Sequence, residues 1–185
     1  MDMTFDEARR VLDEADLLMG EEEIQGAIGR MAGEITGRLA GSNPVVLCIM
    51  NGGLIFSGQL LPRLHFPLEL DYVHATRYGQ ATWGDRLNWH RRPHLNLVGR
   101  TVLLLDDILD EGITLAAIIE YCRGMGALEV LTAVLVEKLH SRKVTPGIRA
   151  DFTGLEIGDR FLFGYGLDYK GYWRNAPGIF AVKGM

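Results

Sequence analysis

Apolar residues along the chain follow two different periods, one typical of helices and one typical of strands. Residues 6–19, 21–39, 54–64 and 115–123 place apolar side chains three and four positions apart, which predicts four amphipathic helices. Acidic residues lead the first two of these segments, where the positive end of a helix dipole favours them. The interruptions between segments are rich in glycine, asparagine and proline, as expected of turns.

Short apolar runs separate these helices and predict strands. The strongest is TVLLL at residues 101–105, which is β-branched and apolar, as expected of a central parallel strand covered on both faces. The other predicted strands are residues 45–50, 68–74, 129–136, 152–157, 160–163 and 179–182. Residues 77–94 show no period and are expected to form a long loop. Strands alternating with helices predict an α/β fold with a central, mostly parallel sheet flanked by helices.

Length and charge narrow the function classes. A chain of 185 residues is expected to form a single domain, residues 1–185. Its 24 acidic against 19 basic residues give a net charge of −5, which argues against a nucleic-acid partner. Membrane association is not expected, because the apolar run 45–50 is far shorter than the roughly 20 residues that span a bilayer. Two cysteines and the lack of a signal pattern at the N-terminus favour a cytoplasmic location.

A polar, acidic run follows the central strand and carries the candidate chemistry. Gly112 and Thr114, at the start of a predicted helix, suit a phosphate, because backbone amides are free there. Asp106 and Asp107 would lie beside that phosphate and suit sugar hydroxyls or Mg²⁺. The alternative is a solvated loop with a helix cap. A receiver-type phosphoacceptor site would need acidic residues after the first strand, where residues 50–53 read MNGG. The run therefore predicts a site for a ribose 5-phosphate.

The segment VLLLDDILDEGITL resembles the phosphoribosyl-pyrophosphate signature of purine salvage phosphoribosyltransferases, and the chain is similar to the hypoxanthine-guanine phosphoribosyltransferase family. The resemblance extends from about residue 21 to the C-terminus. It includes MNGG, the Arg77-Tyr78-Gly79 start of a mobile cover loop, VLVEK, and the tail DFTGLEIGDRFLFGYGLDYKGYWR. It implies a type I phosphoribosyltransferase fold with a small hood formed by terminal segments, and a homodimer or homotetramer. The implied reaction transfers 5-phosphoribosyl from phosphoribosyl pyrophosphate to a 6-oxopurine, hypoxanthine or guanine, with Mg²⁺, giving IMP or GMP and pyrophosphate.

The resemblance also assigns roles to individual residues. Asp110 is implied as the general base at the purine N7, or as a carboxylate that only orients the base, and the sequence leaves both open. The phosphoribosyl group is assigned to Asp106, Asp107, Asp110, Glu111, Gly112, Ile113 and Thr114. Pyrophosphate is assigned to Asn51, Gly52, Gly53 and Arg174, and a non-proline cis peptide is implied within residues 50–53. The purine is assigned to Lys138, Phe161, Leu162 and Asp168, and the metal to Asp106, Asp107 and Asp168.

Several residues depart from the family pattern. Asn51 stands where a basic residue is common, Asp106 where Glu is commoner, and Glu111 where a small hydroxyl residue is usual. These departures bear on affinity for the phosphoribosyl donor more than on the reaction class. The five histidines, His65, His74, His90, His94 and His140, show no metal-ligand spacing. Two rival functions remain: a non-catalytic regulator that senses phosphoribosyl pyrophosphate or nucleotides on the same fold, and a generic nucleotide-binding α/β enzyme.

Overall fold

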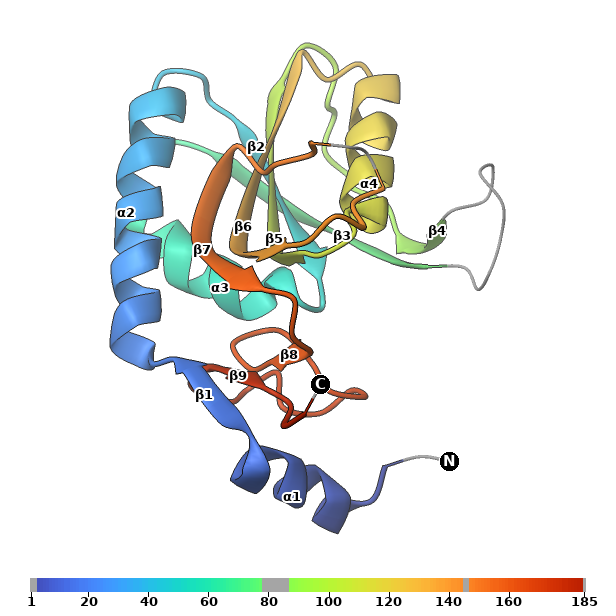
Figure 1. Ribbon diagram of the computed structural model, residues 1–185. Coiled ribbons are helices and arrows are strands. Elements are labelled where there is room, and N and C mark those ends of the chain that lie inside the picture. Colours follow the sequence, from blue (N-terminus) through green and yellow to red (C-terminus); the bar gives the residue numbers. More distant parts are fainter. Residues whose placement is uncertain (1–2, 78–86, 145–146, 185) are drawn as a thin grey trace.

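The computed structural model describes residues 3–77, 87–144 and 147–184, and a sheet of six strands forms the centre of this part of the chain (Figure 1). The strands are β2 (Val45–Met50), β3 (Glu69–Arg77), β4 (Leu87–Arg91), β5 (Thr101–Leu109), β6 (Glu129–Leu139) and β7 (Phe152–Gly158). Their order is β4-β3-β2-β5-β6-β7, and every neighbouring pair is parallel except β3 with β4. The prediction of a mostly parallel sheet is confirmed.

Helices cover both faces of this sheet. On one face lie α2 (Glu21–Leu39) and α3 (Gly53–Leu60), with the short 3₁₀ helix η1 (Leu61–Arg63) following α3; on the other lies α4 (Ile113–Gly124) (Figure 1). Successive side chains of a strand point to opposite faces. Leu103 and Leu105 accordingly join the core beneath α2 and α3, whereas Val102 and Leu104 join the core beneath α4. This double burial explains why β5 begins with an unbroken apolar run.

Both ends of the chain build a smaller unit at one end of the main sheet. β1 (Asp16–Met19), β9 (Ile179–Ala181) and β8 (Leu162–Phe163) form an antiparallel sheet in the order β1-β9-β8. The helix α1 (Phe5–Glu14) lies beside it, and the indole nitrogen of Trp173 donates to the Ala8 carbonyl at 2.6 Å. We call this unit the hood. The expectation of a hood formed by terminal segments is confirmed.

Several predicted element boundaries were wrong, most clearly at the N-terminus. The helix predicted over 6–19 ends at Glu14, and the residues from Asp16 to Met19 form β1 instead. The last turn of α1 has no basic residue, so the negative end of the helix dipole is not compensated there. Pairing with β9 satisfies the backbone of residues 16–19 and packs Leu18 and Met19 against the main core. Tertiary contacts therefore override a periodicity that is compatible with a helix.

The predicted long loop 77–94 contains a strand, so that prediction was also wrong in part. β4 pairs antiparallel with β3, and the Asp71 carboxylate holds its far end, accepting from the Arg91 guanidinium at 2.8 Å and from the His94 N–H at 2.6 Å. Residues 78–86, which include Tyr78, Gly79 and Trp83 of the expected cover loop, lie outside the described residues. In the described ranges, no helix has the length and apolar character needed to cross a bilayer.

Candidate active site

A cavity of about 440 Å³ lies between the main sheet and the hood. Its sheet side is formed where β2, β3, β5 and β6 end, and its other side is formed by the hood. Ligands of open α/β sheets bind beyond the carboxyl ends of the strands, so the position is the expected one. The cavity wall includes Asn51, Gly52, His74, Thr76, Asp106, Asp107, Asp110, Gly112, Ile113, Thr114, Lys138, Phe161, Leu162, Asp168 and Arg174.

The turn after β2 is packed tightly against the end of β5 and against the hood. The peptide between Met50 and Asn51 is cis, as the resemblance implied. A Cβ atom on Gly52 would overlap the Asp107 carboxylate, and one on Gly166 would overlap the Gly52 carbonyl oxygen. Gly166 also has φ +110°, a conformation that residues with a side chain rarely adopt. Two glycines therefore allow the turn, the acidic strand end and the hood to meet.

We expect Gly166→Ala to lower the free energy of unfolding by about 3 kcal/mol more than a glycine-to-alanine substitution that causes backbone strain alone. The matched control is Gly99→Ala, because Gly99 has φ +71° but open space where its Cβ would lie. The free energy of unfolding in urea, measured by far-ultraviolet circular dichroism, gives the comparison. Equal losses in the two variants would contradict the close approach of the hood to the Gly52 turn.

The loop between β5 and α4 offers a site for a phosphate. Gly112 has φ +81° and caps α4 without a side-chain hydrogen bond, so the first amides of this helix are not occupied by a cap. Gly112, Ile113 and Thr114 line the cavity. Free amides together with a hydroxyl at the positive end of a twelve-residue helix favour an anion.

Two of the predicted site residues do not reach the cavity wall. Glu111 is absent from the lining, and its carbonyl oxygen accepts the Val144 N–H at 2.7 Å, which ties the loop after β6 to the phosphate loop. Gly53 is buried, and a Cβ on it would lie 2.7 Å from the Leu105 carbonyl oxygen. Gly53 thus allows α3 to approach β5 rather than facing a ligand.

Asp106 and Asp107 lie within β5, not in a turn after it, because the strand runs on to Leu109. Both residues are more than nine-tenths buried. Burial, reinforced by the neighbouring Asp107 carboxylate, raises the pKa of Asp106 well above its usual range, and burial also raises the pKa of Asp107. The Arg174 guanidinium lies 3.8 Å from Asp107. Two buried carboxyl groups beside one guanidinium make this wall of the cavity favourable for hydroxyl donors or a cation.

The carboxylates near Arg174 fit a magnesium ion that is shared with substrate phosphates. Asp168 pairs through Oδ1 with Arg174 Nη2 at 2.5 Å and accepts the Gly171 N–H through Oδ2 at 2.7 Å. Among the described residues, no three His, Cys, Asp or Glu side chains are placed to hold a metal ion by themselves. Mg²⁺ commonly binds one or two carboxylates plus phosphate oxygens and water, so the acids here match that pattern.

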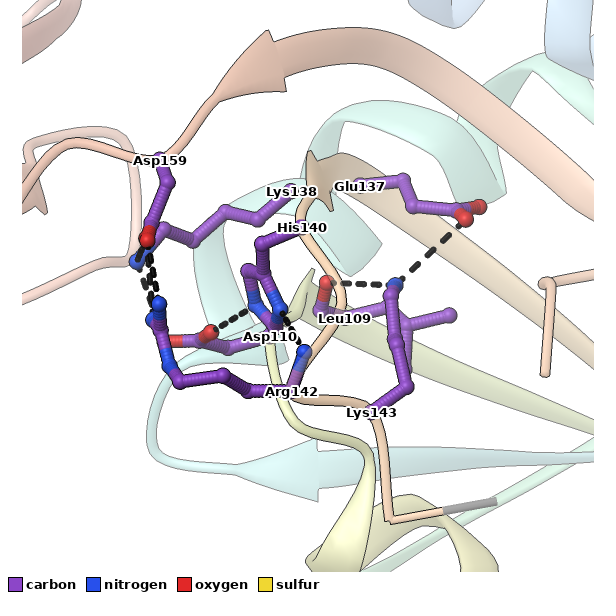
Figure 2. Close-up of polar contacts among 8 residues, drawn as sticks. All are labelled: Leu109, Asp110, Glu137, Lys138, His140, Arg142, Lys143 and Asp159. Atoms are coloured by element: carbon purple, nitrogen blue, oxygen red, sulfur yellow. Dashed lines mark hydrogen bonds and ion pairs between the residues drawn. The ribbon is translucent and has the colours of Figure 1, made fainter. Parts of the chain in front are cut away.

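The cavity wall also includes a buried lysine between two carboxylates (Figure 2). Lys138 belongs to β6, which extends beyond its predicted end, and its Nζ lies 3.2 Å from both Asp110 Oδ2 and Asp159 Oδ1. Burial by itself would raise the pKa of Asp110, but hydrogen bonds from His140 and Lys138, with the lysine's charge, bring it below its ordinary value. Phe161 is 45% exposed and lines the same cavity, so ring surface is available for stacking.

Some residues that the structure places at this site were not singled out from the sequence. His74 and Thr76 line the cavity from the end of β3, and His140 and Asp159 contact Asp110 and Lys138. The rule that ligands lie beyond the strand ends pointed to His74, because β3 neighbours β2 in the sheet. The position of His140 two residues after Lys138 was a further signal. Metal-ligand spacing among the histidines reveals neither residue.

The comparisons with known proteins agree with this geometry. The family described as "Phosphoribosyl transferase domain" matches residues 20–170. The hypoxanthine-guanine phosphoribosyltransferase of Bacillus subtilis is 32% identical over 168 residues, which cover 90% of this chain and 92% of that protein. A hypoxanthine phosphoribosyltransferase structure from Staphylococcus aureus superposes with a TM-score of 0.86 at 27% identity, covering 93% of this chain and 94% of that one. One from Trypanosoma cruzi, in complex with the product IMP, gives 0.85 at 26% identity, covering 93% and 95%.

Proposed function

The chain belongs to the phosphoribosyl transferase domain family, and from this premise we propose that it transfers 5-phosphoribosyl from phosphoribosyl pyrophosphate to hypoxanthine or guanine. The products are IMP or GMP and pyrophosphate, and the reaction is purine salvage. The observation that carries the proposal is the convergence, in one cavity, of a phosphate loop, a buried acid pair and a lysine with a carboxylate. These three features match the three parts of the product: the phosphate, the sugar and the 6-oxopurine.

The donor is held by the sheet side of the cavity. The amides at Gly112 to Thr114 receive the 5-phosphate, and Asp106 and Asp107 accept hydrogen bonds from the ribose hydroxyls. The turn at Asn51 and Gly52, with Arg174, faces the pyrophosphate. Carboxylates among Asp106, Asp107 and Asp168 would hold Mg²⁺, which would supply positive charge to stabilise the leaving pyrophosphate.

The acceptor is held by the opposite end. Phe161 stacks on the purine, Leu162 lies at its edge, and the Lys138 ammonium donates to the 6-oxygen. Asp110 accepts the proton that leaves the purine N7 while a purine ring nitrogen bonds to the sugar carbon and the bond from that carbon to pyrophosphate breaks. Lys138 Nζ and Asp110 Oδ2 lie 3.2 Å apart in the free protein, so a purine that binds both side chains competes with this ion pair.

An assay of pyrophosphate release tests the proposal and separates it from its main rival, the sensing regulator. Purified protein with phosphoribosyl pyrophosphate and Mg²⁺ is given hypoxanthine, guanine, xanthine or adenine in turn, and pyrophosphate is measured. We expect release with hypoxanthine and guanine and very little with adenine. If the protein binds the donor but releases no pyrophosphate with any base, it is the sensing regulator instead. The base-binding end at Lys138 and Phe161, which a sensor of the donor alone would not need, favours the enzyme.

Two further features bear on the location and the partners of the enzyme. The free, buried thiols of Cys48 and Cys122 suit a reducing cytoplasm. The net charge of −5 gives no reason to expect a nucleic-acid partner. The homodimer or homotetramer stays a prediction, which sedimentation analysis of the full chain would test.

A further inference from the structure

The two oxygens of the Asp110 carboxylate have partners of different kinds. Oδ2 faces the Lys138 ammonium at 3.2 Å, and Oδ1 faces the Nε2 atom of His140 at 2.6 Å (Figure 2). Lys138 is shared with Asp159, which lies at the same distance from its Nζ. The lysine therefore keeps a carboxylate partner, Asp159, if a substrate takes its place at Asp110.

The hydrogen bonds of His140 fix which ring nitrogen carries the proton. The backbone N–H of Arg142 lies 3.1 Å from Nδ1 and is a donor, so Nδ1 has to be an unprotonated acceptor. Nε2 then carries the ring proton and donates it to Asp110 Oδ1. In this tautomer Nε2 already carries a proton, and the remaining lone pair, on Nδ1, accepts from the Arg142 N–H, so Nε2 is not free to take the proton that Asp110 receives from the purine.

We propose that His140 is a positioning residue, which holds Asp110 through Nε2–H so that Oδ2 receives the purine proton once the substrate has drawn Lys138 away. The inference rests on the proposed function, because it takes Asp110 as the group that faces the purine N7. Without His140, departure of Lys138 would leave the carboxylate free to rotate. With His140, one oxygen stays occupied and the other stays aimed into the cavity.

The loop that carries His140 is anchored to the backbone on both sides of Asp110. The His140 side chain is 4% exposed, against 38% for Asp110. The Val144 N–H donates to the Glu111 carbonyl at 2.7 Å, and the Lys143 ammonium lies 3.4 Å from both the Leu109 carbonyl and the buried Glu137 carboxylate (Figure 2). These contacts fasten the His140 loop to the same stretch of backbone that carries Asp110. The distance between the two side chains is therefore set by the backbone and not by the substrate.

The electrostatic effect of this contact has a definite direction. A donor to the ionised carboxylate favours ionisation, so loss of the His140 hydrogen bond should raise the pKa of Asp110. The other charged groups around the carboxylate act alongside it: Lys138, Arg142, Asp159 and Glu111. A variant that removes only the His140 donor therefore isolates the contribution of this hydrogen bond to the pKa of Asp110.

Two substitutions separate the positioning role from a merely structural one. In His140→Gln the amide nitrogen takes the place of Nε2 and keeps the donor to Asp110, but the acceptor for the Arg142 N–H is lost. In His140→Asn the amide oxygen takes the place of Nδ1 and keeps that acceptor, but the donor to Asp110 is lost. We expect His140→Asn to lower kcat about tenfold with the KM for phosphoribosyl pyrophosphate unchanged, and His140→Gln to stay within about twofold of wild type. His65→Gln, an exposed histidine outside the cavity, is the control.

A second measurement does not depend on turnover. Carbon-13 NMR of the aspartate carboxyl groups, with the Asp110 signal identified by its absence in Asp110→Asn, follows the pKa of Asp110 in the free protein. We expect a higher pKa in His140→Asn and a value near wild type in His140→Gln. Equal behaviour of the two variants, or a defect in His140→Gln alone, would overturn the positioning role. If the wild-type protein releases no pyrophosphate, the proposed reaction fails, but the NMR comparison still decides whether His140 holds Asp110.

Discussion

Replacing Asp110 by Asn should lower turnover with hypoxanthine about 100-fold or more, with little change in donor binding. The amide has the shape of the carboxylate, and its oxygen can still accept from His140. Its NH2 group then faces Lys138, which keeps its other carboxylate partner, Asp159. The amide loses the negative charge and nearly all of the basicity. The expected loss therefore reports proton acceptance rather than disorder.

The measurement is kcat at saturating donor and base, together with the dissociation constant for phosphoribosyl pyrophosphate from calorimetry. Asp159→Asn is the matched control, because Asp159 is the other carboxylate at 3.2 Å from Lys138. That variant makes the same chemical change to a partner of the lysine, and we expect it to cost less than about fivefold. Turnover in Asp110→Asn close to that of wild type would leave Asp110 only an orienting role.

The second large effect concerns Lys138. We expect the wild-type protein to prefer hypoxanthine over adenine by about 10⁴-fold in kcat/KM. The lysine has donors only, and its side chain is 8% exposed. An amine at purine position 6 would place donor against donor in a buried site, which costs more than a missing contact. Lys138→Ala should depress use of hypoxanthine and guanine far more than it affects binding of the phosphoribosyl donor.

Lys138→Gln is the sharper variant, since its amide can present a donor or an acceptor. It should narrow the gap between hypoxanthine and adenine, chiefly by damaging use of hypoxanthine. The quantity compared is the ratio of kcat/KM for the two bases in wild type and in both variants, each checked for folding by circular dichroism. A ratio that stays constant across all three proteins would show that Lys138 does not read the base.

The sequence predicted the sheet and the position of the site more completely than the details of either. TVLLL marked the central strand because both of its faces are buried, a condition that shows in composition. The acidic run after it was expected to be a turn, yet Asp106 and Asp107 continue the strand. Acidic residues have low strand propensity, and only the pairing with β6 explains their extended conformation.

Contacts between distant segments could not be predicted from local patterns. Residues 16–19 are apolar enough for a helix or a strand, and the partner that decides lies at Ile179–Ala181. His140 likewise has no motif of its own, and its role depends on a tautomer set by the Arg142 backbone. Sequence spacing reveals residues that act through their own chemistry, whereas residues that act through a neighbour need the three-dimensional arrangement.

The hood also sets the order of events during synthesis. β1, at residues 16–19, and its partner β9, at residues 179–181, lie far apart in the sequence, so β9 is translated long after β1. Domains commonly begin to fold before translation ends. The main sheet can therefore form during translation while the edge of β1 is still unpaired. Asp168 and Arg174, which complete the cavity, also come late in the chain. A nascent chain can thus fold its phosphate loop early, but its cavity is complete only once the segment from Asp168 to β9 has been made and β9 has paired with β1.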